Sequence, residues 1–62
     1  MFDEYEDIML VPDVQEALQV GRNRVYQLVQ EGSIKAIRLG KGWRIPKKSV
    51  IDFVMTQAGL NK

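Results

Sequence analysis

Amide and guanidinium side chains recur between residues 22 and 30 at a spacing that a helix would bring to one side. Asn23, Gln27 and Gln30 lie four and three residues apart, and Arg24 directly follows the first of them. Arginine, asparagine and glutamine can make bidentate contacts with guanine or adenine edges in the major groove. The alternative is an ordinary solvated helix face, although such a face usually carries Glu and Lys. The pattern predicts contact with DNA bases or phosphates through Arg22, Asn23, Arg24, Tyr26, Gln27 and Gln30.

A second basic group lies in a stretch where apolar and charged residues alternate, as they do in a β-hairpin. The alternation covers residues 37–39 and 43–45, on either side of Gly40-Lys41-Gly42. A three-residue loop would place all four apolar side chains of these strands on one face, whereas a two-residue loop would mix the faces. Gly42 would then take the left-handed position that ends such a loop. The predicted cross-strand pairs are Leu39 with Trp43, Arg38 with Arg44, and Ile37 with Ile45.

This register sets Arg38 directly opposite Arg44 on the outward face of the hairpin. Like charges opposite each other destabilise a strand pair, and a DNA phosphate between them would remove that cost. The alternative is that both guanidinium groups extend into water. Lys41 would project from the hairpin tip toward a DNA backbone or minor groove. Lys47 and Lys48 follow at a helix start, where cations oppose the helix dipole; phosphates nearby would offset that penalty, and a solvated lysine pair is the alternative.

The elements that position these residues begin with a helix at Pro12, because proline suits the first turn of a helix. Its apolar stripe is Val11, Val14, Ala17 and Leu18. A short break over residues 19–21 leads to a second helix over about residues 22–31, which stops at Gly32. The side chains that this helix buries are Val25, Leu28 and Val29. Two short helices joined by a three-residue turn that contains glycine describe a helix-turn-helix.

Pro46 opens a last helix over about residues 46–58, which Gly59 ends. Its predicted buried residues are Val50, Phe53 and Val54, with Ile51 at the margin, and Trp43 of the hairpin is expected to pack in the same core. The order of helix, turn, helix, two strands and helix predicts a winged helix-turn-helix, mainly α with a small two-stranded hairpin. The predicted divisions are an acidic arm over 1–8, the DNA-binding domain over 9–58 and a tail over 59–62.

Charge is distributed very unevenly along the chain. Residues 1–21 hold six acidic residues and no base, whereas residues 22–48 hold eight of the nine basic residues and one acid, Glu31. The net charge of +1 is therefore the sum of a strongly basic middle segment and an acidic N-terminal segment. Positive charge on a helix and an adjoining hairpin suits a duplex nucleic acid. Residues 1–7 are expected either to fray or to form a negative arm that limits nonspecific DNA contact or touches a partner.

Several classes of function are excluded by composition. The chain of 62 residues has no cysteine and no histidine, so disulfides, thiolate chemistry and the usual zinc sites are not expected. The Gly-Lys-Gly turn lacks the spacing of a P-loop, and no nucleophile has an activating base, so neither an enzyme nor a cofactor is predicted. No apolar run approaches the roughly 20 residues of a membrane span. The expectation is a soluble cytoplasmic protein associated with the nucleoid.

Four stretches of the chain together resemble the excisionase-type DNA-binding domain, a small winged-helix relative of the MerR N-terminal domain. The stretches are VGRNRVYQLV at 20–29, EGSI at 31–34, IRLG at 37–40 and WRIP at 43–46. The resemblance implies that the second helix enters the major groove and that the hairpin contacts the backbone or minor groove. On this basis Arg22, Asn23, Arg24, Tyr26 and Gln27 match recognition-helix positions, and Arg38, Lys41 and Arg44 match wing positions.

The sequence departs from the family pattern at the helix starts and in the turn. Leu10 and Val11 stand where a Ser or Thr often precedes the first helix, and Gln19 replaces a glycine of the turn. Gly21 stands where a serine often caps the second helix. These departures concern the positions at which the helices begin and leave the expected fold unchanged.

The resemblance also implies a function. Members of the family include recombination directionality factors, which bind beside an integrase at attachment sites, bend the DNA and favour excision of a mobile element. The favoured interpretation is therefore an excisionase that binds double-stranded DNA, with an integrase as a possible partner. The alternatives are a small MerR-like transcriptional regulator and a module that binds an acidic protein. The protein is expected to be a monomer in solution that assembles side by side on DNA.

Overall fold

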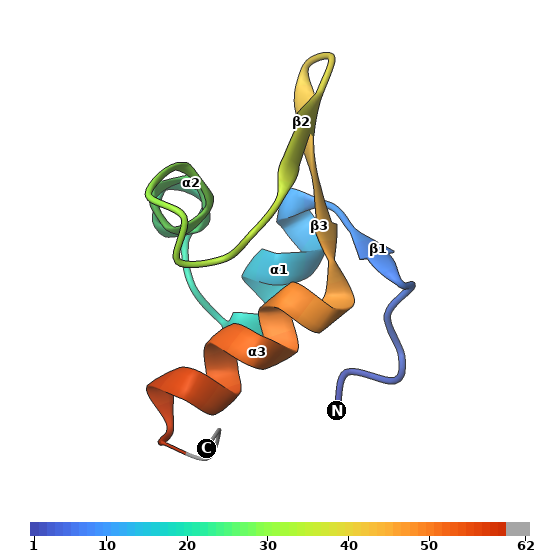
Figure 1. Ribbon diagram of the computed structural model, residues 1–62. Helices are drawn as coiled ribbons and strands as arrows, with labels where there is room; N and C mark the ends of the chain where they lie inside the picture. The colour runs from blue at the N-terminus through green and yellow to red at the C-terminus, as the bar shows by residue number, and fades with distance from the viewer. Residues whose placement is uncertain (60–62) are drawn as a thin grey trace.

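Three helices and three short strands make up the part of the chain that the computed structural model describes, residues 1–59. In order they are β1 (Ile8–Met9), α1 (Val11–Leu18), α2 (Arg22–Gln30), β2 (Ile37–Leu39), β3 (Gly42–Pro46) and α3 (Lys47–Gln57), as Figure 1 shows. The predicted winged helix-turn-helix is confirmed, with β1 as an unpredicted addition. Of the tail predicted over 59–62, residues 60–62 lie outside the described residues.

Helix α1 begins and ends without the residues that the family pattern favours. The backbone N–H of Leu10 donates to the carboxylate of Asp13 over 3.0 Å, so an acid in the first turn replaces part of the missing Ser or Thr cap. Gln19 ends the helix with a left-handed backbone (φ 56°), and the N–H of Val20 donates to the carbonyl of Gln15 over 3.1 Å. Gln19 therefore adopts the conformation for which glycine is usual, at a steric cost that glycine would not carry.

Helix α2 follows after Gly21 and packs across α1 as the second helix of the helix-turn-helix. Its buried side chains are Val25, Leu28 and Val29, as predicted. Glu31 ends the helix, and Gly32 follows with a left-handed backbone (φ 88°). The N–H of Ile34 then donates a hydrogen bond to the carbonyl of Leu28 over 3.1 Å. This hydrogen bond turns the chain back toward the helix.

Within residues 1–59, the core consists of nine buried apolar side chains drawn from all three helices, two strands and the loop after α2. They are Met9, Val11, Val14, Val25, Leu28, Val29, Ile34, Ile45 and Val50. Met9 and Ile34 are fully buried although the sequence patterns did not single them out. Helix α3 contributes less than predicted, because Val50 alone is buried, whereas Ile51, Phe53 and Val54 remain half-buried.

The hairpin has a different register from the predicted one. Residue pairs are Ile37 with Arg44, Arg38 with Trp43, and Leu39 with Gly42. The loop therefore contains two residues, Gly40 and Lys41, and the prediction of a three-residue loop was wrong. Gly40, and not Gly42, has the left-handed backbone (φ 58°), as the first central residue of a type II′ turn requires.

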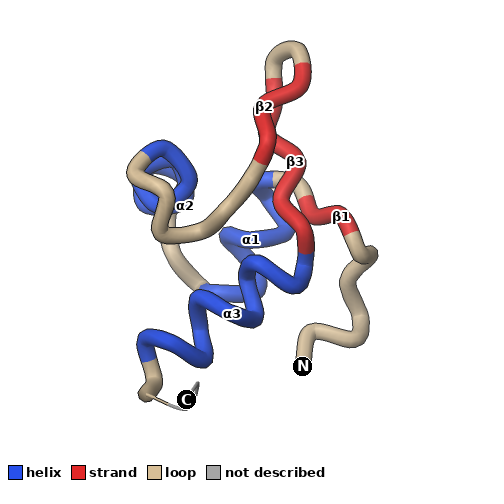
Figure 2. Tube along the Cα trace, in the orientation of Figure 1, coloured by secondary structure: helices blue, strands red, loops and turns tan. Residues whose placement is uncertain are grey.

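The new register divides the apolar residues of the hairpin between two faces. Trp43 and Ile45 face the core, as predicted, but Ile37 and Leu39 lie on the other face and are 58% and 52% exposed. The register prediction failed because it required every apolar residue of the hairpin to be buried. The hairpin extends past the helices (Figure 2), so no core lies beneath β2 to impose that requirement.

The N-terminal segment is attached to the fold rather than frayed. Strand β1 pairs antiparallel with β3, Ile8 opposite Pro46 and Met9 opposite Ile45, which gives a sheet of order β1-β3-β2. The predicted boundary between residues 8 and 9 thus falls inside a strand. The backbone N–H of Lys47 donates to the carbonyl of Asp7 over 2.7 Å. Backbone hydrogen bonds therefore hold residues 1–7, the acidic segment, beside the start of α3.

Two aromatic side chains fasten the acidic segment further. Phe2 and Tyr5 form an edge-to-face pair with ring centroids 6.1 Å apart, and both pack against the core. The hydroxyl of Tyr5 donates to Glu16 of α1 over 2.8 Å. This hydrogen bond, together with the negative charge of Glu16, raises the pKa of Tyr5 to about 12. The acidic segment is thereby tied to α1 as well as to β3 and α3.

Alanine substitutions at the two loop glycines distinguish the two registers. Gly40→Ala should destabilise the fold by roughly 1–2 kcal/mol, because a left-handed backbone crowds a Cβ atom. Gly42→Ala is the matched control, since a Cβ there would meet only the end of the Arg44 side chain, at 3.3 Å, which can move away. Urea unfolding followed by circular dichroism gives both values. A larger loss for Gly42→Ala than for Gly40→Ala would contradict the two-residue turn.

Candidate nucleic-acid interface

Helix α2 presents one polar face to solvent. Val25, Leu28 and Val29 point into the core, and Tyr26 at the margin is half-buried. The exposed side chains on the opposite side are Arg22, Asn23, Arg24, Gln27 and Gln30. Helical periodicity thus gathers every residue predicted for the recognition helix on the exposed face or at its margin.

Two of these side chains are hydrogen-bonded to each other. The Nη1 atom of Arg24 donates to the Oε1 atom of Gln27 over 2.9 Å, one helical turn away. An arginine has no acceptor, so the amide must turn its oxygen toward Arg24 and its NH₂ group away. The pair therefore offers hydrogen-bond donors to a ligand. Guanine O6 and N7, thymine O4 and phosphate oxygens are the matching acceptors on DNA.

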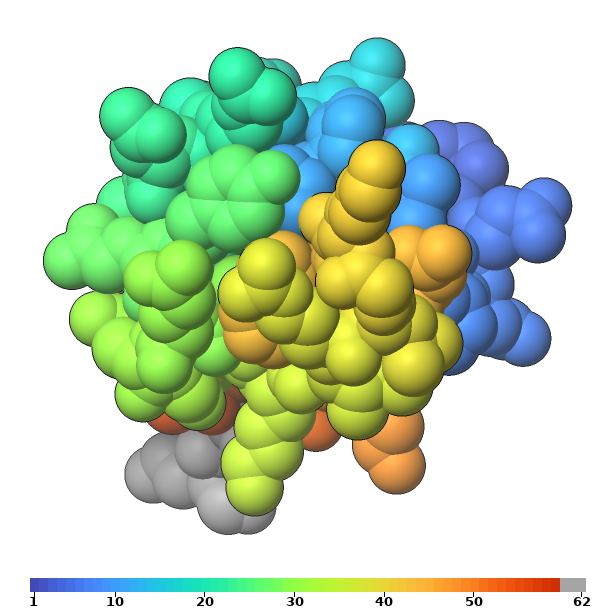
Figure 3. Space-filling model, turned by 90° about the horizontal axis from the view of Figure 1, so that it is seen from above, coloured from blue at the N-terminus to red at the C-terminus, as the bar shows by residue number. Residues whose placement is uncertain are grey.

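The hairpin stands beside α2 on the same face of the molecule. Figure 3 views that face, with α2 in green and the hairpin in yellow next to it. A face that carries an exposed polar helix and a projecting hairpin has the two elements that a winged helix-turn-helix applies to neighbouring grooves of a duplex. The structure therefore brings the α2 residues and the hairpin tip together, as expected.

Arg38 lies on the inner face of the hairpin, the face that also carries Trp43. Its guanidinium carbon is 5.9 Å from the centroid of the Trp43 ring, directly across the strand pair. A guanidinium over an indole is stabilised by the ring quadrupole. The stacking restricts the Arg38 side chain and keeps its charge close to the hairpin.

Arg44 lies on the opposite, outer face of the hairpin. Its Nη1 atom is 3.4 Å from the carbonyl oxygen of Trp43 and reaches back over Gly42, toward the tip that carries Lys41. The prediction that Arg38 and Arg44 face each other across one phosphate was therefore wrong. The observed register instead gives the hairpin a positive side chain on each face and one at its tip.

The two lysines predicted at the start of α3 lie at the other end of β3 from the tip. Four residue steps separate Gly42 from Pro46, a distance of about 13 Å in a strand. The amine of Lys47 is 3.4 Å from the carbonyl oxygen of Tyr5 and 3.9 Å from Asp7, so the acidic segment partly neutralises it. Lys48 is exposed. The structure thus does not group Lys47 and Lys48 with the hairpin tip.

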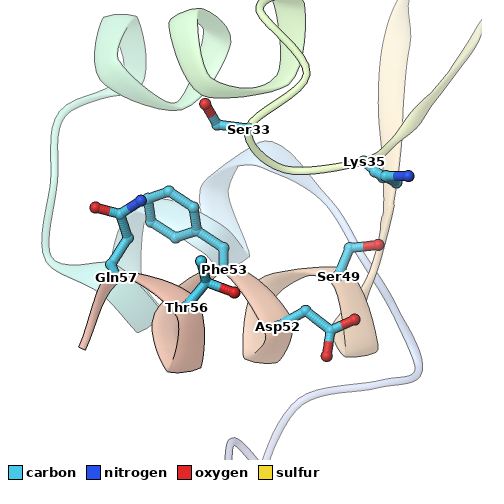
Figure 4. A pocket seen from close by; sticks show the side chains of 7 residues that line it. All are labelled: Ser33, Lys35, Ser49, Asp52, Phe53, Thr56 and Gln57. Carbon is cyan, nitrogen blue, oxygen red and sulfur yellow. The ribbon is translucent and has the colours of Figure 1, made fainter. Parts of the chain in front are cut away.

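A hollow of about 360 Å³ opens between α3 and the loop after α2, as Figure 4 shows. The residues that line it are Ser33, Lys35, Ser49, Asp52, Phe53, Thr56 and Gln57. None of them belongs to the predicted DNA contacts. Within residues 1–59, no three acidic side chains gather as a metal site would need. The helices of these residues also lack the length and apolar content required to cross a membrane.

Comparison with known proteins agrees with this geometry. The family model of the helix-turn-helix domain matches residues 9–58. An excisionase of Streptomyces ambofaciens is 34% identical over 53 residues, which cover 86% of this chain and 86% of that protein. A putative DNA-binding protein of Mycobacterium tuberculosis is 33% identical over 79% of this chain and 63% of its own length.

A probable excisionase of Saccharopolyspora erythraea is 33% identical over 46 residues, which are 74% of this chain and 47% of that protein. No solved structure matches the chain. The family model and the Streptomyces protein each align with most of the chain, including the helix-turn-helix and the hairpin. The chain therefore belongs to the helix-turn-helix domain family, and it carries a DNA-binding domain of the excisionase type.

Proposed function

We propose that this chain is an excisionase: a protein without catalytic activity that binds double-stranded DNA at attachment sites, bends it and promotes integrase-mediated excision of a mobile element. The observation that carries the proposal is the 34% identity to the Streptomyces excisionase over 86% of both chains. The exposed face of α2 and the adjoining basic hairpin supply the DNA-binding surface. The chain acts by positioning DNA, and the integrase supplies the chemistry.

On this proposal the hairpin enters the minor groove while α2 lies in the adjacent major groove. The minor groove has a phosphate backbone on each side, about 6 Å apart. The hairpin carries Arg38 on one face and Arg44 on the other, so one arginine reaches each strand. Lys41 at the tip adds charge at the groove floor or edge. In this arrangement each arginine contacts a phosphate of its own strand, whereas the incorrect register placed one phosphate between the two arginines.

The Arg24–Gln27 pair supports a more specific proposal for α2. Adenine presents a donor beside an acceptor in the major groove, and a bidentate amide contact with it needs both the oxygen and the NH₂ group directed at the base. The oxygen of Gln27 already accepts from Arg24. The pair is therefore suited to guanine, which presents two acceptors. Asn23, one turn earlier, remains available for adenine.

Binding as a monomer is also part of the proposal. The apolar residues of α1 and α2, with Val50 and Phe53 of α3, lie in the shared core or pack against it, and neither α1 nor α2 carries a second apolar stripe that would pair with another chain. Several copies would then meet only on DNA, side by side. A small transcriptional regulator of the same fold is the second candidate, because the mycobacterial relative is named only as a DNA-binding protein.

An excision assay separates these two candidates. A reporter element flanked by its attachment sites, with its integrase, should excise at least about tenfold more often when this chain is present. DNase footprinting should show protection within the attachment region, and circular permutation gels should show bending there. Chain with Arg24 and Arg44 both changed to alanine is the control for DNA binding. Protection only at a promoter, with no change in excision, would favour the regulator.

Gln27→Ala should separate base reading from backbone binding. We expect a loss of roughly 1–3 kcal/mol on the selected target site and little change on scrambled duplex, because the pair that donates to guanine is broken. Gln57→Ala, an exposed glutamine on α3, is the matched control and should change neither affinity. Fluorescence anisotropy on both duplexes measures the effect. Equal losses on the two duplexes would show that Gln27 does not read bases.

Affinity should fall steeply with salt because the surface binds phosphates. Four contacts through Arg22, Arg38, Lys41 and Arg44 predict a slope of log K against log salt of about −3 to −4. Arg44→Ala should reduce the slope by about one, whereas Lys35→Ala, outside the predicted interface, should leave it unchanged. The measurement is a salt series on a duplex with a single site. A wild-type slope shallower than about −2 would rule out this surface.

A further inference from the structure

Leu39 is an exposed aliphatic side chain next to the tip of the hairpin. It is the last residue of β2, directly before the turn at Gly40 and Lys41, and it is 52% exposed. The hairpin extends past the helices at this end (Figure 2). Leu39 belongs neither to the buried core nor to the residues packed against it, whereas Trp43 of the same hairpin does. Packing within residues 1–59 therefore does not explain a leucine at this position.

The space across the hairpin from Leu39 is taken by a cation. The register pairs Leu39 with Gly42, which has no side chain. The Nη1 atom of Arg44 lies 3.3 Å from the place where a Cβ atom of residue 42 would be. Its guanidinium therefore occupies the outer face opposite Leu39, and Lys41 follows Leu39 after a single glycine. One apolar side chain and two cations thus share the end of the hairpin.

An apolar group beside a cation matches one strand of a DNA groove. Each nucleotide places an anionic phosphate beside a deoxyribose ring, whose C–H surface is apolar. Residues 32–51 contain six basic residues and no acid, so this part of the chain attracts an anion. A partner protein seated on Leu39 would have to displace whatever Lys41 and Arg44 contact. Because the proposed function assigns both cations to DNA, DNA is the occupant that all three side chains can share.

We propose that Leu39 is an apolar wedge, which enters the minor groove with the hairpin tip, packs against deoxyribose and base edges, and holds the groove open. A sheet with side chains on both faces is about 10 Å thick, whereas the minor groove is about 6 Å wide. Arg38 on the inner face and Leu39 on the outer face give the hairpin this thickness. An opened minor groove bends the duplex toward the major groove. The inference rests on the proposed DNA binding and assigns the proposed bend to one side chain.

The wedge also implies a sequence preference that needs no hydrogen bond to a base. Pyrimidine–purine steps such as TA unstack easily, whereas A-tracts are stiff and have a narrow minor groove. Opening the groove therefore costs less free energy at a TA step, and the hairpin favours such a step beneath Leu39. The hairpin then selects DNA by its deformability, while α2 reads base edges in the major groove.

The bend angle on a duplex with one selected site tests the wedge. Leu39→Ala should reduce the bend in circular permutation gels to about half or less, because the groove is no longer held open. Affinity should fall roughly fivefold, since the exposed half of the leucine surface is no longer buried against DNA. Ile37→Ala is the matched control: Ile37 lies on the same face, is 58% exposed and is about 6.6 Å farther from the tip. It should bind and bend DNA as the wild type does.

Salt and sequence dependence distinguish the wedge from a phosphate contact. Leu39→Ala should leave the slope of log K against log salt unchanged, whereas Arg44→Ala reduces it by about one. Moving a single TA step along the part of the site beneath the hairpin should change wild-type affinity by roughly tenfold, and that of Leu39→Ala by less than about twofold. Leu39→Met keeps a long apolar side chain and should retain the bend and the preference.

Two variants guard against loss of the hairpin itself. Leu39→Thr keeps the preference for a strand and removes most of the apolar surface, so it should lose the bend as Leu39→Ala does. Urea unfolding without DNA should give both variants the midpoint of the wild type, because Leu39 lies outside the core.

The possible outcomes separate the wedge from the proposed function. An unchanged bend in both Leu39→Ala and Leu39→Thr, with binding intact, overturns the wedge and leaves DNA binding standing. An equal loss of bending in Ile37→Ala also overturns it, because the contact would then extend over the whole outer face. Failure of the wild-type chain to bind any duplex overturns the proposed function together with the wedge.

Discussion

The two-residue turn at Gly40 and Lys41 is the constraint on which the functional surface depends. Side chains alternate along a strand with a period of two, so the length of the turn decides the face on which every hairpin residue lies. This turn places Arg38 over Trp43 on the inner face and Arg44 on the outer face. One more loop residue would set both arginines on the same side. The hairpin would then have one repulsive pair in place of a positive charge on each face.

The helices could be predicted from the sequence because their signals are local. The apolar spacing of α2, with Gly21 before it and Gly32 after it, determines where the helix lies and which face it buries. The hairpin register depended on a non-local quantity, the amount of core beneath β2, which alternation does not reveal. Strand β1 was missed for a similar reason: two residues have no period, and their pairing with β3 brings together positions 36 and 38 residues apart in the chain.

In the candidate site, too, some features follow from local sequence patterns and others depend on contacts between distant parts of the chain. The exposed face of α2 follows from helical geometry alone, and the residues predicted for it are together there. The Arg24–Gln27 hydrogen bond turns the amide NH₂ group of Gln27 outward, and the i, i+3 spacing of the two residues alone does not say which partner each side chain chooses. Lys47 was predicted to lie near DNA phosphates because it is a cation at a helix start. Its contacts with Tyr5 and Asp7 come from a segment about forty residues earlier, which only the folded chain brings close.

The division of the sheet between two faces follows from the small size of the domain. Antiparallel sheets commonly pack one face on a core and present polar residues on the other. Here the inner face is covered by the helices, with Met9 and Ile45 fully buried, and no described element remains to cover the outer face. That face nevertheless carries Ile8, Ile37 and Leu39. Exposed apolar side chains in one patch reduce solubility and add nothing to the core, so the core cannot account for their presence there.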